Sequence, residues 1–140
     1  MNIFIGNIRM IPPFIYQLLD HIYISDIRGF AVYDMFDIVI RTDNIKHSGD
    51  LIVKNLSEHT LFINTSVGDK DETDELVLRM KTYSDQSKKT LLYSNSLETS
   101  CSLYVSYLKS KYKFSNEDIT HIFSSAKYPS VLIQTFLNQL

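Results

Sequence analysis

The stretch from Thr90 to Lys109 carries the pattern that points most directly to chemistry. An apolar run ends at Tyr93, mostly small polar residues follow from Ser94 to Ser102, and apolar residues with helical spacing resume at Leu103. This order predicts a buried strand, a tight polar loop and a helix. Such a loop directs backbone N–H groups and the positive end of the helix dipole at one point, as many phosphate-binding sites do.

The same stretch resembles the active-site segment of the dual-specificity phosphatases, a branch of the cysteine-dependent protein phosphatases. In that family a strand ends in His-Cys, five residues follow, and Arg-Ser or Arg-Thr opens a helix that often carries Ala-Tyr-Leu-Met. Tyr93-Ser94 falls where His-Cys belongs, and Thr99-Ser100 falls where Arg-Ser belongs if the loop is one residue shorter. Counting back without a gap from Ser106-Tyr107-Leu108-Lys109, which matches the Ala-Tyr-Leu-Met turn, puts Tyr93 at the cysteine position instead. The degenerate phosphate loop then comprises Tyr93, Ser94, Asn95, Ser96, Leu97, Glu98, Thr99 and Ser100.

The resemblance implies the fold of a phosphatase without its catalytic groups, which is a pseudophosphatase. The family's nucleophile is a thiolate, whereas the hydroxyl of Ser94 is far harder to ionise. The family's arginine holds two phosphate oxygens in a planar fork, whereas Thr99 offers one hydroxyl and no charge. Glu98 adds a negative charge that repels a phosphate. We therefore expect no enzymatic activity from this loop.

An aspartate of the family's preceding loop protonates the leaving oxygen, and Asp69 stands at about the matching place, with Asp71 as the next candidate. Without a nucleophile this acid would have no leaving group to serve, so we expect Asp69 to be a third degenerate position. The alternative is that these acidic residues cap the predicted helix Glu75 to Lys81. For Cys101, which follows the loop, we expect a buried small residue at the helix start rather than a displaced nucleophile.

The surrounding elements predict an α/β fold with a central, mostly parallel sheet flanked by helices, similar to that of the dual-specificity phosphatases. The resemblance covers Ile22 to Leu140. Predicted strands are rich in β-branched and aromatic residues, and predicted helices have apolar residues at helical spacing. The strands are expected at 21–26, 37–41, 51–53, 61–63 and 90–93, a short helix at 31–36, and helices after the capping-box-like Ser115 to Asp118 and at 131–137.

Residues 1–20 are interpreted as an N-terminal extension to a domain formed by residues 21–140. Phe14, Ile15, Leu18 and Leu19 recur at helical spacing after Pro12-Pro13, which predicts a helix. Its apolar face has two interpretations. It packs on the domain's own core, or it mediates self-association.

The composition excludes several classes of protein. The chain of 140 residues is 44% hydrophobic, with a formal net charge of -2, so it shows no global bias toward nucleic acid or anionic membranes. No apolar run approaches the roughly 20 residues that span a bilayer, and the N-terminus lacks the features of a signal peptide. Cys101 is the only cysteine, which fits a reducing, intracellular location, cytoplasmic or virus-associated. The abundance of Ile, Asn, Lys, Ser and Tyr suggests an AT-rich genome or a virus.

These observations favour a non-catalytic interaction or structural module that forms homo-oligomers and binds a protein whose identity the sequence does not reveal. Two alternatives remain open, namely a phosphopeptide-binding module that shields phosphosites and an enzyme of unrelated mechanism on the same frame. We expect no cofactor, and no metal because the histidines lack ligand spacing. The lysines that alternate with aromatic residues from Lys109 to Phe114 fit a solvated helix end better than a nucleic-acid groove.

Overall fold

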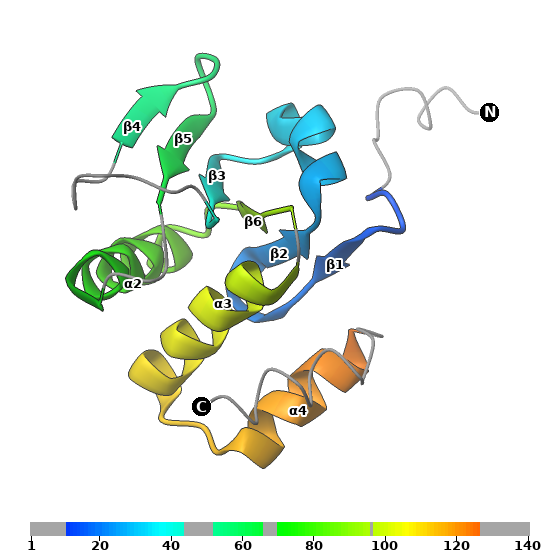
Figure 1. Cartoon of the computed structure of the whole chain (residues 1–140), viewed down its shortest axis with the longest axis vertical. Coiled ribbons are helices and arrows are strands. Elements are labelled where there is room, and N and C mark those ends of the chain that lie inside the picture. The colour runs from blue at the N-terminus through cyan, green and yellow to red at the C-terminus, as the bar shows by residue number, and fades with distance from the viewer. Residues whose placement is uncertain (1–10, 44–51, 66–69, 96, 127–140) are drawn as a thin grey trace.

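In the computed structural model, the chain folds into a six-stranded mixed sheet with helices on both faces (Figure 1). The structure describes residues 11–43, 52–65, 70–95 and 97–126. The strands are β1 (Ile15–Gln17), β2 (Ile22–Ser25), β3 (Ile38–Arg41), β4 (Ile52–Asn55), β5 (Leu61–Asn64) and β6 (Thr90–Tyr93). The 3-10 segments are η1 (Leu19–His21) and η2 (Ile27–Met35), and the α-helices are α2 (Lys70–Asp85), α3 (Leu97–Tyr112) and α4 (Asn116–Ser125).

The centre of the sheet is parallel, as predicted. The strand order is β1-β2-β6-β3-β5-β4, in which β2, β6, β3 and β5 are parallel and the two edge strands, β1 and β4, are antiparallel to their neighbours. Every residue of β2 and β6 is buried, as expected for strands covered on both faces. The predicted α/β class and the predicted strands at 21–26, 37–41, 51–53, 61–63 and 90–93 are confirmed.

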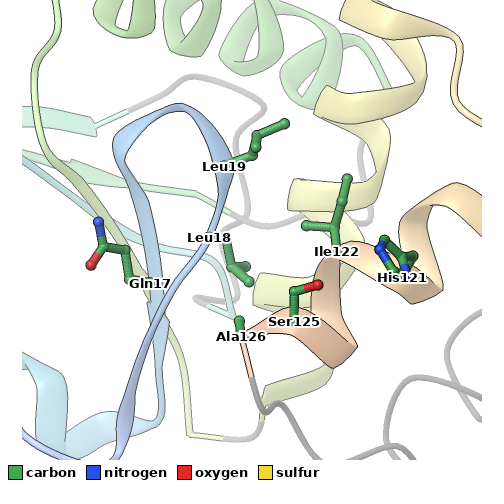
Figure 2. A pocket seen from close by; sticks show the side chains of 7 residues that line it. All are labelled: Gln17, Leu18, Leu19, His121, Ile122, Ser125 and Ala126. Carbon is green, nitrogen blue, oxygen red and sulfur yellow. The ribbon is translucent and has the colours of Figure 1, made fainter.

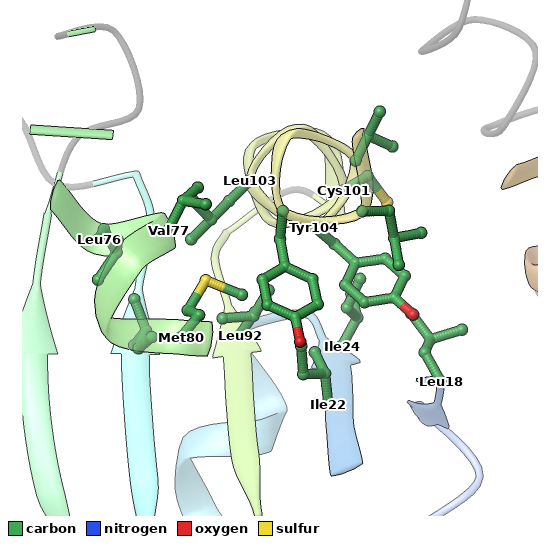
Figure 3. Close-up of a cluster of buried hydrophobic side chains, with 14 of the residues drawn as sticks. Leu18, Ile22, Ile24, Leu76, Val77, Met80, Leu92, Cys101, Leu103 and Tyr104 are labelled. Carbon is green, nitrogen blue, oxygen red and sulfur yellow. The ribbon is translucent and has the colours of Figure 1, made fainter. Parts of the chain in front are cut away.

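One face of the sheet carries α2 and α3, and alternate strand residues supply the core beneath them (Figure 3). Ile24, Ile40 and Leu92, from three neighbouring strands, are fully buried against this layer. The helix α4 packs on α3, where the rings of Tyr104 and Phe123 meet edge to face at 5.7 Å. The capping box predicted at Ser115 is present at the start of α4.

The other face is covered by η2 and is rich in aromatic side chains. Tyr23 and Phe36 meet edge to face with their ring centroids 5.1 Å apart. Gly29 is the buried residue of η2, and a Cβ atom built there would lie 2.6 Å from the hydroxyl oxygen of Ser25 and 2.7 Å from its Cβ. Since the Cβ of Ser25 is fixed by the strand, this close approach of η2 to β2 requires glycine.

Replacing Gly29 with alanine should therefore reduce the free energy of unfolding by about 1–3 kcal/mol, because η2 must move away from β2. Denaturant unfolding of the single variants Gly29→Ala and Ser25→Gly and of the double variant measures the coupling. We expect the double variant to be more stable than the sum of the single changes predicts. Strictly additive effects would show that the clash between the two positions is not what destabilises Gly29→Ala.

The prediction of a helix over the N-terminal apolar residues is wrong. Ile15 lies in β1, which pairs with β2, and Leu19 opens the short segment η1. The sequence contains apolar residues at helical spacing, but Pro12 and Pro13 lead into a turn, and the sheet edge offers Ile15 to Gln17 a strand partner. Both Ile15 and Leu18 are buried within this chain, at 6% and 7% exposure.

The segment η1 is held to α3 by a polar network. Asp20 has a positive φ of 63° and accepts hydrogen bonds from the hydroxyls of Tyr107 at 2.7 Å and of Tyr112 at 2.7 and 2.8 Å. The amine of Lys111 lies 3.2 Å from the same carboxylate. The hydroxyl of Tyr104 accepts a bond from the backbone N–H of Leu19 at 3.0 Å. These contacts fix the C-terminal half of α3 against the turn between β1 and β2.

Candidate functional site

The segment between β6 and α3 lies where the sequence places the phosphate-binding loop, but it is much shorter than predicted. Strand β6 ends at Tyr93 and α3 begins at Leu97, so only residues 94–96, the β6–α3 loop, separate them. Leu97, Glu98, Thr99 and Ser100 form the first turn of α3 and are not part of a loop. Ser96 lies outside the described residues.

Helix α3 begins earlier than predicted because its apolar face extends into the mostly polar segment from Ser94 to Ser102. Leu97, Cys101, Tyr104 and Leu108 follow one another at spacings of four, three and four residues, so the apolar face extends one and a half turns before Leu103. Glu98 in the first turn interacts favourably with the helix dipole. Cys101 is 3% exposed within α3, as expected for a structural small residue.

Four hydroxyl groups meet at the start of α3. The hydroxyl oxygens of Ser94 and Ser100 lie 3.1 Å apart, and Ser100 is 3.1 Å from the hydroxyl of Thr42, which follows β3. Thr42 lies 2.8 Å from the hydroxyl of Thr99 and donates to the carbonyl of Tyr93 at 3.4 Å. Ser94, Ser100 and Thr42 are fully buried. This hydroxyl cluster (Thr42, Ser94, Thr99 and Ser100) therefore fills the base of the site with neutral groups that bond to one another.

The sequence analysis assigned Ser94, Thr99 and Ser100 to one phosphate loop. In the structure Ser94 contacts Ser100, and Thr42 links Ser100 to Thr99. The sequence analysis missed Thr42. The available signal was the position of Thr42 directly after a predicted central strand, since the carboxyl ends of parallel strands meet at the same edge of the sheet.

An internal carboxylate occupies the mouth of the site. The backbone N–H of Asn95 donates to Asp43 at 2.7 Å, and the Nε of Arg41 donates to the other oxygen of Asp43 at 2.9 Å. Burial alone would raise the pKa of Asp43, but the bonds from Asn95 and Arg41 outweigh it, so the pKa lies below its usual value. Asp43 is therefore an anion, and it already bonds an amide that a phosphate loop would offer to its ligand. The sequence analysis missed both Asp43 and Arg41.

Tyr93 and Ser94, the two alternatives for the nucleophile position, belong to opposite faces of the sheet. The ring of Tyr93 packs with the aromatic cluster beneath η2, 5.5 Å from the ring of Phe30. Burial raises the pKa of the Tyr93 hydroxyl, and the nearby charge of Arg41 opposes this only in part. Ser94, in contrast, contacts the first turn of α3.

The predicted acidic positions do not converge on the β6–α3 loop within the described residues. Asp69 lies outside them, and Asp71 is exposed in the first turn of α2, where acidic residues favour the dipole. Glu72, which the sequence analysis did not single out, is 3% exposed and accepts a hydrogen bond from Thr65 at 2.6 Å. In the part of the chain that the structure describes, no group of three or more His, Cys, Asp or Glu side chains forms a metal site.

Two of the four residues proposed for self-association border a hollow between η1 and α4, whereas Phe14 and Ile15 belong to the cluster on the η2 face of the sheet. Leu18 and Leu19 line this cavity of about 370 Å³ from one side, and His121 and Ile122 line it from the other (Figure 2). Leu19 is 42% exposed. These contacts all lie within one chain and do not test binding to a second copy, so self-association stays a prediction. None of the helices in the described ranges is long and apolar enough to span a membrane.

Comparison with known proteins agrees with this architecture. No protein-family model and no curated protein matches the sequence. Among solved structures, Tk-PTP in its active form matches with a TM-score of 0.62 at 14% identity, covering 93% of this chain and 97% of its own. Human DUSP28 matches with a TM-score of 0.59 at 12% identity, covering 92% of this chain and 96% of its own. The chain therefore has the fold of the dual-specificity phosphatases, over nearly its whole length.

Proposed function

We propose that this protein is a non-catalytic member of the dual-specificity phosphatase fold that acts as a protein interaction or structural module. The observation that carries the proposal is the hydroxyl cluster at the start of α3. Ser94 is fully buried, and its hydroxyl contacts that of Ser100 at 3.1 Å. A serine hydroxyl is far harder to ionise than a thiol, so a buried one among other hydroxyls is a poor nucleophile.

The charges around the β6–α3 loop also support the proposal. The carboxylate of Asp43 accepts the N–H of Asn95 at 2.7 Å, and Glu98 lies in the first turn of α3. An incoming phosphate would meet the carboxylate of Asp43 at the Asn95 amide, and Glu98 adds a second negative charge to this end of α3. Arg41, which is close by, is already bonded to Asp43. Such an arrangement disfavours both the binding and the transfer of a phosphoryl group.

The test is hydrolysis of p-nitrophenyl phosphate by the wild type and by the variants Ser94→Ala and Cys101→Ala, with an active cysteine-dependent phosphatase as the positive control. Ser94→Ala removes the nucleophile candidate, and Cys101→Ala removes the only thiol of the chain. We expect all three proteins to give the rate of the buffer blank. Turnover by the wild type that either substitution abolishes would refute the proposal and would identify the nucleophile.

A further inference from the structure

A second hollow lies on the opposite face of the sheet from α3, at the carboxyl ends of the parallel strands. Arg41, Asn64 and Tyr93 are the last residues of β3, β5 and β6, and they lie side by side in register. Together with η2 and β4 they border a cavity of about 530 Å³, within the usual size of a small-ligand site. This cavity, here called the η2 pocket, is lined by Ile27, Arg28, Phe30, Ala31, Arg41, Lys54, Leu56, Phe62, Asn64 and Tyr93.

Aromatic rings form one side of the η2 pocket. The ring of Phe30 lies 5.5 Å from that of Tyr93 and 6.1 Å from that of Phe62. Tyr93 and Phe62 are nearly buried, whereas Phe30 is 36% exposed. A large apolar ring held in place by other rings and still open to solvent offers a rigid surface on which a flat ligand can stack.

The charge of the lining is one-sided. Among the described residues that line the η2 pocket, Arg28, Arg41 and Lys54 are cationic and none is acidic, although the chain carries a formal net charge of -2. Arg28 and Arg41 form ion pairs with Asp26 and Asp43, which lie outside the lining. The amine of Lys54 lies 5.4 Å from the ring centroid of Phe62, and no carboxylate of a described residue pairs with it. Lys54 therefore leaves a positive charge directly beside the aromatic surface.

We propose that the η2 pocket binds a planar aromatic anion, with its ring on Phe30 and its charged group near Lys54, the lining cation that no described carboxylate pairs with. Stacking alone would accept a neutral ring, and the cations alone would accept any anion. The combination selects a ligand that has both features. The pocket borders the candidate site through Tyr93 and Arg41 but contains no residue of the hydroxyl cluster, so this proposal goes beyond the non-catalytic role.

The probe is naphthalene-2-sulfonate, titrated into the ¹⁵N-labelled protein while the amide resonances of Phe30, Arg41 and Lys54 are followed by NMR. A ligand of this size should bind with a Kd of about 1 mM or tighter. Naphthalene-2-methanol, which keeps the ring and lacks the charge, and methanesulfonate, which keeps the charge and lacks the ring, should each bind about tenfold or more weakly.

Variants separate the two features. Phe30→Ala should raise the Kd about three- to tenfold, and Lys54→Glu should raise it about fivefold. The matched control is Lys88→Glu, because Lys88 also lies over an aromatic ring, that of Tyr83, but precedes β6 at the opposite end of the sheet. Phe30, Lys54 and Lys88 are all exposed, and circular dichroism checks that each variant keeps its fold.

Competition identifies the natural source of the ligand. Displacement of the probe by AMP, a planar aromatic anion, would support the proposal. Displacement by the peptide Asp-Glu-Phe-Glu-Asp, whose ring is neutral, without displacement by AMP would point to an acidic protein partner and would overturn it. Equal affinity for the neutral alcohol, no saturable shift at the three amides, or equal effects of Lys54→Glu and Lys88→Glu would overturn it.

Discussion

Replacing Leu76 with alanine should lower the free energy of unfolding by about 2–5 kcal/mol, the range observed when a large buried side chain is truncated in a packed core. Leu76 is fully buried where α2 meets the sheet (Figure 3). Its removal would leave a cavity that the neighbouring strands fill only in part. Urea denaturation followed by circular dichroism measures the change.

Leu78 on the same helix provides the matched control, because it is 62% exposed. Leu78→Ala should change the free energy of unfolding by no more than about 0.5 kcal/mol. Comparable losses of unfolding free energy in Leu76→Ala and Leu78→Ala would contradict the orientation of α2, in which Leu76 faces the core and Leu78 faces solvent.

Asp20→Asn should reduce the free energy of unfolding by about 1.5–3 kcal/mol at neutral pH, the usual worth of hydrogen bonds to a charged group. The substitution removes the negative charge that Tyr107, Tyr112 and Lys111 share. Asparagine also tolerates the positive φ of 63° at this position, so backbone strain does not contribute to the loss. Thermal unfolding monitored by circular dichroism reports the effect.

The same substitution should make stability less dependent on pH. Burial alone would raise the pKa of Asp20, but the hydrogen bonds from Tyr107, Tyr112 and Lys111 lower it further than burial raises it. Because the pKa is lower in the folded than in the unfolded chain, the ionised carboxylate stabilises the protein fully above its unfolded pKa of about 3.9. This contribution is lost as the pH falls through the folded pKa, so the wild type and Asp20→Asn should converge in acid.

Asp85→Asn is the control for both measurements. Asp85 is 3.9 Å from the amine of Lys111 but its side chain is 76% exposed, so its ion pair should contribute at most about 1 kcal/mol. A stability difference between the wild type and Asp20→Asn that stays constant from neutral pH into acid would show that the network does not depend on the charge of Asp20.

Much of the sheet could be predicted because its central strands are apolar on both faces. Runs such as Ile38 to Arg41 and Thr90 to Tyr93 are typical of strands in a parallel sheet, where helices cover each side. Local chemistry also predicted the start of α4, because the capping box at Ser115 needs only residues that are neighbours in sequence.

The predictions failed where the spacing of apolar residues fitted more than one structure. Ile15, Leu18 and Leu19 have helical spacing, but the edge of β2 provides hydrogen-bond partners and makes Ile15 part of a strand. The beginning of α3 was missed for the opposite reason, because Ser100 and Cys101 are small residues that are buried without adding a hydrophobic signal. Tertiary packing decided both cases.

The residues predicted for the β6–α3 end of the candidate site are close to one another in sequence, whereas the partners that come from distant strands were missed. Ser94 and Ser100 lie six residues apart in the segment that the resemblance assigned to the phosphate loop, and their hydroxyl oxygens lie 3.1 Å apart. Thr42 and Asp43 are more than fifty residues from Asn95 and Ser100, and only the pairing of β3 with β6 brings them together. No local sequence pattern determines the register between strands that are distant in sequence, so the contacts of Thr42 and Asp43 became apparent only in the structure.

The most direct test of the account is a titration of tungstate, a phosphate-like oxyanion, into the ¹⁵N-labelled protein while the amide resonance of Asn95 is followed. We predict no saturable shift up to millimolar concentrations, because Asp43 already accepts this N–H and the hydroxyl cluster fills the space behind it. A saturable shift of the Asn95 amide that is lost in Ser94→Ala would show that the β6–α3 loop still binds an oxyanion, and it would contradict the central claim.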